Sequence, residues 1–258
     1  MRLPKVQENP GADLNGCVAF DGVPDRVGIG VVVPFDLVLD HEYWQWVPNN
    51  VSLHVTRTPA LEMPMDLRMA SRIGEAEVVA EATRNLLAAA PVVVVYACTS
   101  GSFVGGVARE GRLRTAMEQA GAPRALTTSG ALLMALESLG ARRVAIGTPY
   151  DEEVTVELSR FLAEAGYDTV SSAFLGLTGG IYRVNRETVG RLAAAADQAE
   201  ADAVFLSCTN LRTFGLLPEI EAKLGKPVLA ANQVTMWAAL RAAGLARDWP
   251  RPPPGPQW

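Results

Sequence analysis

Two short turns, each a cysteine followed by two small polar residues, hold the side chains most able to do chemistry. They are Cys98-Thr99-Ser100 and Cys208-Thr209-Asn210, and each follows an apolar run. Small residues after a strand permit a tight turn and leave backbone N–H groups free where the next helix begins. A helix N-terminus attracts anions and lowers the pKa of a thiol. Each turn is therefore predicted to be a carboxylate cradle beside an activated thiolate.

A free cysteine is often no more than a small buried hydrophobic residue. That interpretation suits one isolated cysteine at a strand end better than it suits two Cys-Thr turns in matched positions. A metal site is not expected, because the chain has no CxxC motif and no histidine near Cys98 or Cys208. The third cysteine, Cys17, lies in a polar N-terminal stretch without a counterpart, and we interpret it as incidental.

The two turns belong to a longer internal repeat. VVVPFD at Val31–Asp36 resembles IGTPYD at Ile146–Asp151, and VVVVYACTS at Val92–Ser100 resembles AVFLSCTN at Ala203–Asn210. The order of the motifs is the same and the spacing is similar, with 62 residues from the first aspartate to its cysteine and 57 for the second pair. Such an echo predicts a duplicated half. Two α/β lobes related in this way would bring the carboxyl ends of their strands to a shared cleft, where such sheets bind ligands.

The elements that must position these turns follow from apolar periodicity. Short β-branched runs predict strands at 27–33, 51–56, 92–96, 143–147, 169–175, 203–206 and 227–230. Helical patterns lie between them, at 73–89, 130–139, 152–165, 187–199 and 234–243. Continuous apolar strands alternating with helices are typical of an α/β fold with parallel sheets covered on both faces.

We therefore expect two pseudo-symmetric lobes, each a parallel sheet flanked by helices, with the active site in the cleft between them. The first lobe is predicted to contain residues 27–124 and 228–246, and the second residues 125–227. Residues 1–26 and the proline-rich residues 247–258 are predicted to be tails.

Composition excludes several classes of protein. The 258 residues are 49% hydrophobic and 20% charged, as in ordinary globular proteins rather than disordered or fibrous ones. A net charge of −5 argues against nucleic acid as a partner. No apolar run approaches the roughly 18 residues of a membrane span, so no membrane partner is expected. The N-terminus lacks an apolar signal core, which favours a cytoplasmic location.

The same residue counts bound the chemistry. The only two histidines are His41 and His54, so a site further along must manage without imidazole. Three cysteines argue against a disulfide framework. Neither a Walker A motif nor a GxGxxG turn is present, and no cofactor is expected. The aromatic segment 41–48 and the proline-rich tail favour a homo-oligomer.

Five motifs together resemble the Asp/Glu racemase superfamily, and within it the branch of the maleate cis-trans isomerases and arylmalonate decarboxylases. They are YACTSGSFVGG, GTPYDEEV, LGLTGG, LSCTNL and NQVTMWAALRAAG, and the resemblance runs from about residue 27 to 245. It implies a cofactor-independent enzyme that acts on a small carboxylate. Cys98 matches the cysteine that in maleate isomerases adds covalently to the alkene, and Cys208 matches the second cysteine, which transfers a proton.

The resemblance also implies a carboxylate-binding half. Thr99, Ser100 and the backbone of Thr209 match the family's anion-binding turns. Tyr150 matches a tyrosine whose hydroxyl completes the anion hole, a role suited to stabilising developing enolate charge. Asn232 matches a residue of the last strand–helix turn and is expected to hold the first cysteine loop.

Three features separate the possible reactions. Arylmalonate decarboxylases have glycine at the position of Cys98, so Cys98 favours isomerisation or racemisation, with a maleate isomerase-like activity as the first expectation. Maleate isomerases usually carry Pro-Ser-Ser-Asn-like residues after the first strand, with the asparagine binding the distal carboxylate, whereas this chain has Pro34-Phe35-Asp36-Leu37. An aspartate repels a second carboxylate and suits the ammonium of an amino-acid substrate; it could also cap a helix. Asn210, expected near the substrate, replaces a histidine of glutamate racemases.

Amino-acid racemase, arylmalonate decarboxylase-like enzyme and non-catalytic carboxylate-binding protein are thus the alternatives.

Overall fold

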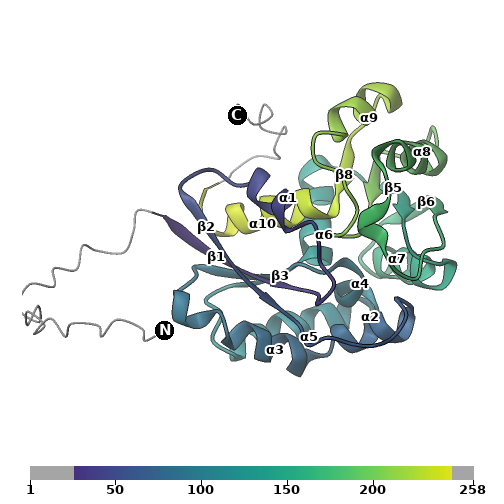
Figure 1. Ribbon diagram of the computed structural model, residues 1–258. Helices are drawn as coiled ribbons and strands as arrows, with labels where there is room; N and C mark the ends of the chain where they lie inside the picture. Colours follow the sequence, from purple (N-terminus) through teal and green to yellow (C-terminus); the bar gives the residue numbers. More distant parts are fainter. Residues whose placement is uncertain (1–25, 246–258) are drawn as a thin grey trace, which may run out of the picture.

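The structure is a computed structural model that describes residues 26–245, and these form two four-stranded parallel sheets (Figure 1). The first sheet has the order β2-β1-β3-β4 and the second the order β6-β5-β7-β8. The strands are β1 (Val27–Val33), β2 (Val51–Arg57), β3 (Val93–Tyr96), β4 (Ala125–Thr127), β5 (Arg143–Thr148), β6 (Asp168–Phe174), β7 (Ala203–Leu206) and β8 (Val228–Ala230). If β1 to β4 are matched in turn with β5 to β8, the two sheets have the same strand order, as expected for a duplicated half.

Helices cover the sheets on both faces. They are α1 (Asp40–Gln45), α2 (Leu67–Ile73), α3 (Ala76–Arg84), α4 (Thr99–Phe103), α5 (Gly106–Gln119), α6 (Thr128–Leu139), α7 (Glu152–Glu164), α8 (Arg186–Ala196), α9 (Leu217–Leu224) and α10 (Ala231–Ala242). α6 and α10 lie together between the two sheets (Figure 1), where the hydroxyls of Thr128 and Thr235 are 2.8 Å apart. Among the described residues, no helix is long and apolar enough to cross a membrane.

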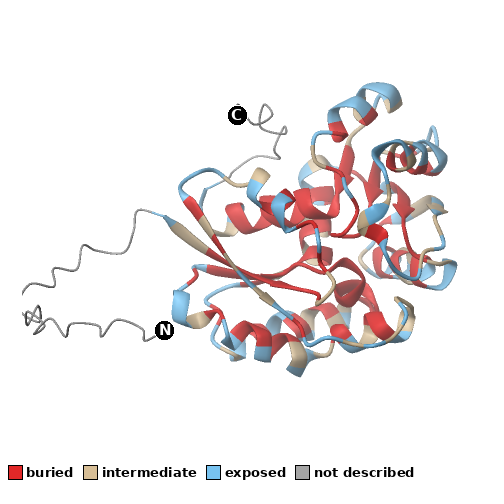
Figure 2. Ribbon diagram, viewed as in Figure 1, coloured by how far each residue is buried: buried red, intermediate tan, exposed pale blue. Residues whose placement is uncertain are grey.

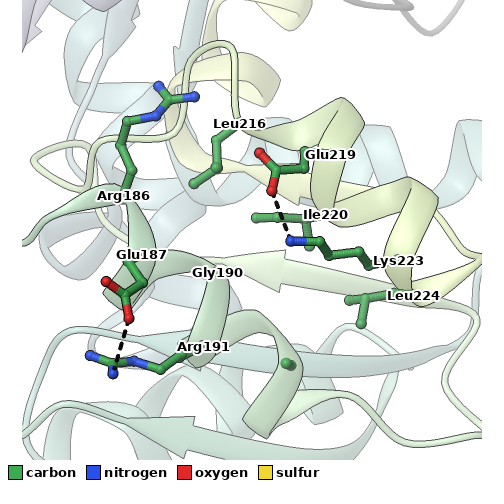
Figure 3. A pocket seen from close by; sticks show the side chains of 10 residues that line it. Arg186, Glu187, Gly190, Arg191, Leu216, Glu219, Ile220, Lys223 and Leu224 are labelled. Atoms are coloured by element: carbon green, nitrogen blue, oxygen red, sulfur yellow. Dashed lines mark hydrogen bonds and ion pairs between the residues drawn. The ribbon is translucent and has the colours of Figure 1, made fainter.

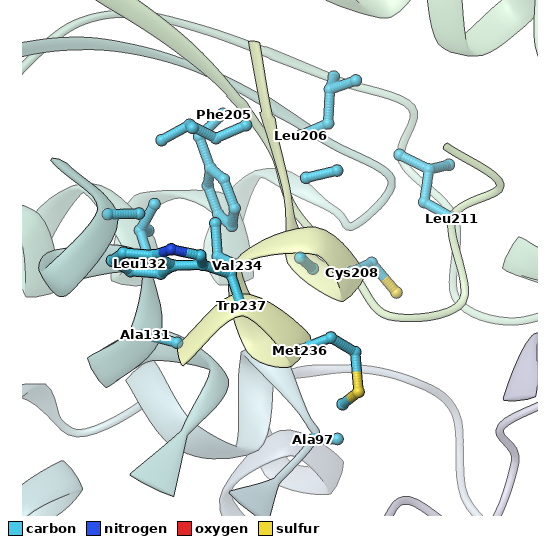
Figure 4. Close-up of a cluster of buried hydrophobic side chains, with 14 of the residues drawn as sticks. Ala97, Ala131, Leu132, Phe205, Leu206, Cys208, Leu211, Val234, Met236 and Trp237 are labelled. Atoms are coloured by element: carbon cyan, nitrogen blue, oxygen red, sulfur yellow. The ribbon is translucent and has the colours of Figure 1, made fainter. Parts of the chain in front are cut away.

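Apolar side chains fill the space between these layers. Every residue of β3 and β7 is buried, as expected for strands covered on both faces, and exposed residues gather on the outer helices (Figure 2). Trp237 on α10 lies in a continuous buried cluster with Leu132, Phe205 and Val234 (Figure 4). Cys208 belongs to the same buried cluster, so its thiol lies in the interior of the protein and not on its surface.

Several elements differ from the expectation. The helix predicted at 73–89 corresponds to α3 and a 3-10 turn at Leu87–Ala89, and α2 ends where that prediction began. α2 ends at Gly74, its C-cap, where the carbonyl oxygen of Gly101 in α4 approaches so closely that a Cβ would overlap it. The elements that were not predicted are α1, α2, α4, α5, α9 and β4. α5 lacks a clear apolar stripe, since its large buried apolar residues are only Leu113 and Met117.

The lobe boundaries also differ slightly. β4 pairs with β3 in the first sheet, and β8 pairs with β7 in the second. The chain therefore changes lobe after Thr127 and after Ala230, three residues later at each crossing than expected. α6 and α10 make the crossings, because each starts directly after an edge strand. Apart from residue 26, the predicted tails lie outside the described residues, as does Cys17.

Candidate active site

One cavity brings together residues from both lobes at the carboxyl ends of β1, β3, β5 and β7. Its lining comprises Pro34, Asp36, Met65, Met69, Ile73, Cys98, Thr99, Ser100, Tyr150, Cys208, Thr209 and Asn210. The structure thus places all eight predicted site residues at one cavity. The volume of this cavity is about 20 Å³, roughly the space of one water molecule.

Cys98 lies at the end of β3 and forms the N-cap of α4. A backbone N–H of Gly101 and the Tyr96 hydroxyl both lower the pKa of its thiol, but burial has the larger effect and raises that pKa to about 11. The prediction of a resting thiolate is therefore wrong. α4 is a single short turn, and its N-terminus does not compensate for removing the sulfur from water.

Cys208 occupies the matched position after β7, with an unusual backbone. Its φ is 91°, a left-handed conformation that is strained for a residue with a Cβ. The backbone N–H of Asn210 lies 3.4 Å from Sγ, and the Tyr150 hydroxyl also lowers the thiol pKa. Burial again has the larger effect and raises the pKa to about 12. Burial therefore favours the neutral form of both thiols.

Hydroxyl groups beside the thiols form a site suited to an anion. The Thr99 hydroxyl is buried and has no hydrogen-bond partner among the described residues, although it belongs to the cavity lining. Ser100 is buried beside it, and the Tyr150 hydroxyl lies 3.5 Å from Ser207 Oγ. A buried polar group without a partner is unfavourable, so this arrangement is suited to a ligand that accepts hydrogen bonds, such as a carboxylate.

Asp36 contributes a carboxyl group to the same cavity. It does not cap α1, whose N-cap is Leu39 with no side-chain bond, so that alternative is wrong. Burial raises the pKa of Asp36, while Arg57 lowers it. The Arg57 guanidinium also donates to the carbonyl oxygens of Phe35 and Leu37, at 3.0 and 2.9 Å, and so holds the loop after β1.

Asn210 has a different role from the one expected. Its side-chain amide donates to the carbonyl oxygen of Asp36 at 3.0 Å, and its Oδ1 accepts from the backbone N–H of Val38 at 2.8 Å. Both polar atoms of the side chain are therefore used to clasp the second cysteine turn to the first lobe. Only the backbone of Asn210 is directed at a reacting group, the Cys208 sulfur.

A second clasp was missed by the sequence analysis. Glu42 of α1 is buried, and its carboxylate accepts hydrogen bonds from the backbone N–H groups of Thr213 and Phe214, the Thr213 hydroxyl and Asn232 Nδ2. Asn232 Nδ2 also donates to Thr209 O at 3.1 Å. Asn232 therefore holds the second cysteine turn rather than the first. No local signal distinguishes Glu42 from the exposed acidic residues around it.

The apolar wall of the cavity was also missed. Met65 precedes α2, and Met69 and Ile73 lie on it. The backbone N–H of Met65 donates to Thr178 O of the second lobe at 3.0 Å, which joins this wall across the cleft. Tyr96 is a further missed neighbour of Cys98. The sequence did contain a signal for Tyr96. It lies two residues before Cys98, and residues two apart on a strand point to the same face.

A larger groove lies far from these residues, between α8 and α9 (Figure 3). Its volume is about 440 Å³, but its charged groups are already paired. Lys223 forms an ion pair with Glu219 at 2.8 Å, and Arg191 forms one with Glu187 at 3.4 Å. It contains none of the predicted site residues. Within residues 26–245 there is also no cluster of His, Cys, Asp and Glu able to hold a metal ion.

In each of the two matched sheets a buried cysteine follows a central strand, and both cysteines line one shared cavity. These features define a class of two-lobed α/β proteins with a pair of thiols. Comparison with known proteins gives the family. The chain belongs to the arylmalonate decarboxylase family, whose model matches residues 67–250. It is thus a member of the Asp/Glu racemase superfamily and a cofactor-independent, cysteine-dependent enzyme of that family.

Relatives of two activities are similar to the chain. Arylmalonate decarboxylase of Bordetella bronchiseptica is 37% identical over 172 residues, covering 65% of this chain and 72% of that protein. Maleate isomerase of Nocardia farcinica is 29% identical over 233 residues, covering 84% and 90%. A double mutant of arylmalonate decarboxylase in its liganded form has a TM-score of 0.80 at 30% identity, with 88% of this chain and 96% of that chain covered.

Proposed function

We propose that this protein is an isomerase that moves a proton at the carbon next to a substrate carboxylate, using Cys98 and Cys208 on opposite sides. The observation that carries the proposal is one buried thiol from each lobe at a single cavity, beside an unpartnered Thr99 hydroxyl. The carboxylate binds to Thr99, Ser100 and Tyr150. The same donors stabilise the negative charge that develops when the neighbouring carbon loses its proton.

Proton transfer follows from the two sulfur atoms. As the substrate binds, one cysteine releases its proton to solvent and becomes a thiolate. This thiolate then removes the proton from carbon and becomes a thiol again. The electron pair passes into the carboxylate as an enediolate. The thiol on the other side then returns a proton to the opposite face and becomes the thiolate. The product is the mirror image, and the enzyme ends with its proton on the other sulfur.

The remaining lining favours one class of substrate. Asp36 repels a second carboxylate and attracts a cationic substituent, because like charges at short distance are unfavourable. Met65, Met69 and Ile73 form an apolar wall that suits a hydrocarbon or aryl group. We therefore place racemisation of an α-substituted carboxylate, such as an apolar amino acid, before isomerisation of a dicarboxylate.

Cis–trans isomerisation of maleate is the second candidate, favoured by the similarity to maleate isomerase and by the cysteine at position 98. In that reaction the Cys98 thiolate adds to one alkene carbon and Cys208 protonates the other. The former double bond then rotates as a single bond. Loss of the same proton to Cys208 and departure of the Cys98 sulfur give the trans product.

Exchange of the α-proton in heavy water, measured by NMR on single enantiomers of amino acids and arylpropionates, tests the proposal. We expect exchange with inversion, and loss of inversion in Cys98→Ser and in Cys208→Ser. Cys17→Ser is the matched control and should keep full activity. Absence of exchange together with fumarate formation from maleate would establish the second candidate. Absence of exchange with carbon dioxide release from an arylmalonate would instead establish a decarboxylase.

A further inference from the structure

Tyr96 is the last residue of β3 and stands close to the Cys98 sulfur. The backbone is still extended at Cys98 (φ −140°, ψ 120°), so side chains two residues apart project from the same face. Tyr96 is fully buried, and both residues belong to one buried cluster. A Cβ at Gly101 would overlap the Tyr96 hydroxyl and lie 3.2 Å from Sγ of Cys98. Hydroxyl and thiol therefore flank one small space that only a glycine leaves open.

The hydroxyl has one proton and two neighbours that can accept it. It donates to the carbonyl oxygen of Ile73 at 2.8 Å. Ile73 is the last residue of α2 and part of the apolar wall of the cavity. The oxygen of Tyr96 keeps lone pairs free to accept from the S–H of a neutral Cys98.

We propose that Tyr96 is a positioning residue that holds the Cys98 thiol and donates its hydroxyl proton to the sulfur in a hydrogen bond when Cys98 becomes a thiolate. This proposal rests on the proposed function, in which Cys98 alternates between the two forms. In the thiol form, Cys98 donates to Tyr96 and Tyr96 donates to Ile73. In the thiolate form, the Tyr96 O–H turns to Sγ, and Ile73 O loses its donor. Ionisation of Cys98 thereby removes a hydrogen bond from the end of α2, which carries part of the apolar wall.

The internal repeat supports this assignment. At Cys208 the sulfur has the Asn210 N–H and the Tyr150 hydroxyl as neighbours. The residue that corresponds to Tyr150 in the first half is Phe35, which has no hydroxyl. Tyr96 supplies the missing group, so that each sulfur has one backbone N–H and one phenol. The Tyr96 hydroxyl indeed lowers the pKa of Cys98, against the larger opposite effect of burial.

Tyr96→Phe tests the proposal through the reactivity of Cys98. Because only the thiolate is alkylated, the rate of iodoacetamide addition between about pH 7 and 10 reports the thiolate fraction. Modification is measured on the Cys98 peptide by mass spectrometry, which separates it from the other cysteines. We expect the rate to fall about tenfold or more, since a hydrogen bond to a charged group is lost. Tyr167→Phe is the matched control, since its hydroxyl also donates to a helix carbonyl, Leu133 O at 3.3 Å.

A purely structural role predicts the opposite result. Loss of the Ile73 bond alone would loosen the cavity and leave alkylation equal or faster, which would overturn the proposal. If Tyr96→Phe does not fold, a monofluorotyrosine placed at position 96 keeps the hydroxyl and makes it more acidic. Alkylation should then be faster than in the parent, and an unchanged or slower rate refutes the proposal. Alkylation needs no turnover, so failure of the proposed function, seen in the exchange assay, is separate from failure here.

Discussion

Replacing Glu42 by glutamine should disrupt the clasp that holds the second cysteine turn. Glu42 Oε1 accepts from the N–H groups of Thr213 and Phe214, at 2.9 and 3.3 Å. Oε2 accepts from the Thr213 hydroxyl and Asn232 Nδ2, at 3.2 and 2.9 Å. Glutamine preserves the shape and the first two bonds, but it places an NH2 group where Oε2 accepted two donors.

The magnitude follows from the geometry of Asn232. If its amide keeps its orientation, two NH2 groups face each other without an acceptor. If the amide flips, its oxygen accepts from the introduced NH2 group and Thr209 O loses its donor. In either case one buried pair is broken, at about 1–3 kcal/mol, and the charge assistance of the remaining bonds is lost. We expect Glu42→Gln to lower the free energy of unfolding by about 2–4 kcal/mol.

Urea denaturation followed by circular dichroism measures this change. Glu219→Gln is the control, since its ion pair with Lys223 is exposed and should contribute less than about 1 kcal/mol. The exchange activity of Glu42→Gln should fall as well. Glu42 orients Asn232, and Asn232 in turn holds the carbonyl of Thr209, which follows Cys208. A loss of stability below about 0.5 kcal/mol with unchanged activity would refute the account of the clasp.

Three further outcomes follow from the site. Cys208→Gly should be more stable than Cys208→Ser by about 1 kcal/mol in urea, because glycine adopts the φ of 91° without strain; equal midpoints would contradict this. Both thiol pKa values are raised on folding, so unfolded chains lose protons first as the pH rises, and stability falls above about pH 9. At pH 10 each thiol should lower the free energy of unfolding by about 1.4 kcal/mol, and a Cys98→Ser, Cys208→Ser variant should lose this part of the decline in a urea series. The part due to the buried Tyr43, Tyr96 and Tyr150, whose pKa values are also raised, should remain. Thr99→Val should lower kcat/KM about 5- to 30-fold with unchanged stability, and an equal loss of stability would show that its hydroxyl is structural.

Local patterns in the sequence were sufficient for the chemistry-bearing residues and most of the strands. The repeat of Pro-aromatic-Asp and Cys-Thr motifs predicted two matched lobes, because each motif marks the carboxyl end of a strand. The runs VGIGVVV and AVFL are buried strands as expected. These two strands could be predicted because a strand buried on both faces must be apolar at successive positions.

The tertiary structure alone decided how those residues act. Burial raises both thiol pKa values where the local turn predicted a lower one, and burial depends on neighbours far away in the chain. Asn210 was predicted to contact the substrate. Its side-chain oxygen instead accepts a hydrogen bond from the backbone of Val38, 172 residues away in the chain. Glu42 and the methionine wall have no distinctive local pattern. The sequence by itself thus determined which groups are present and at which strand ends, whereas packing between the lobes determined their protonation and their partners.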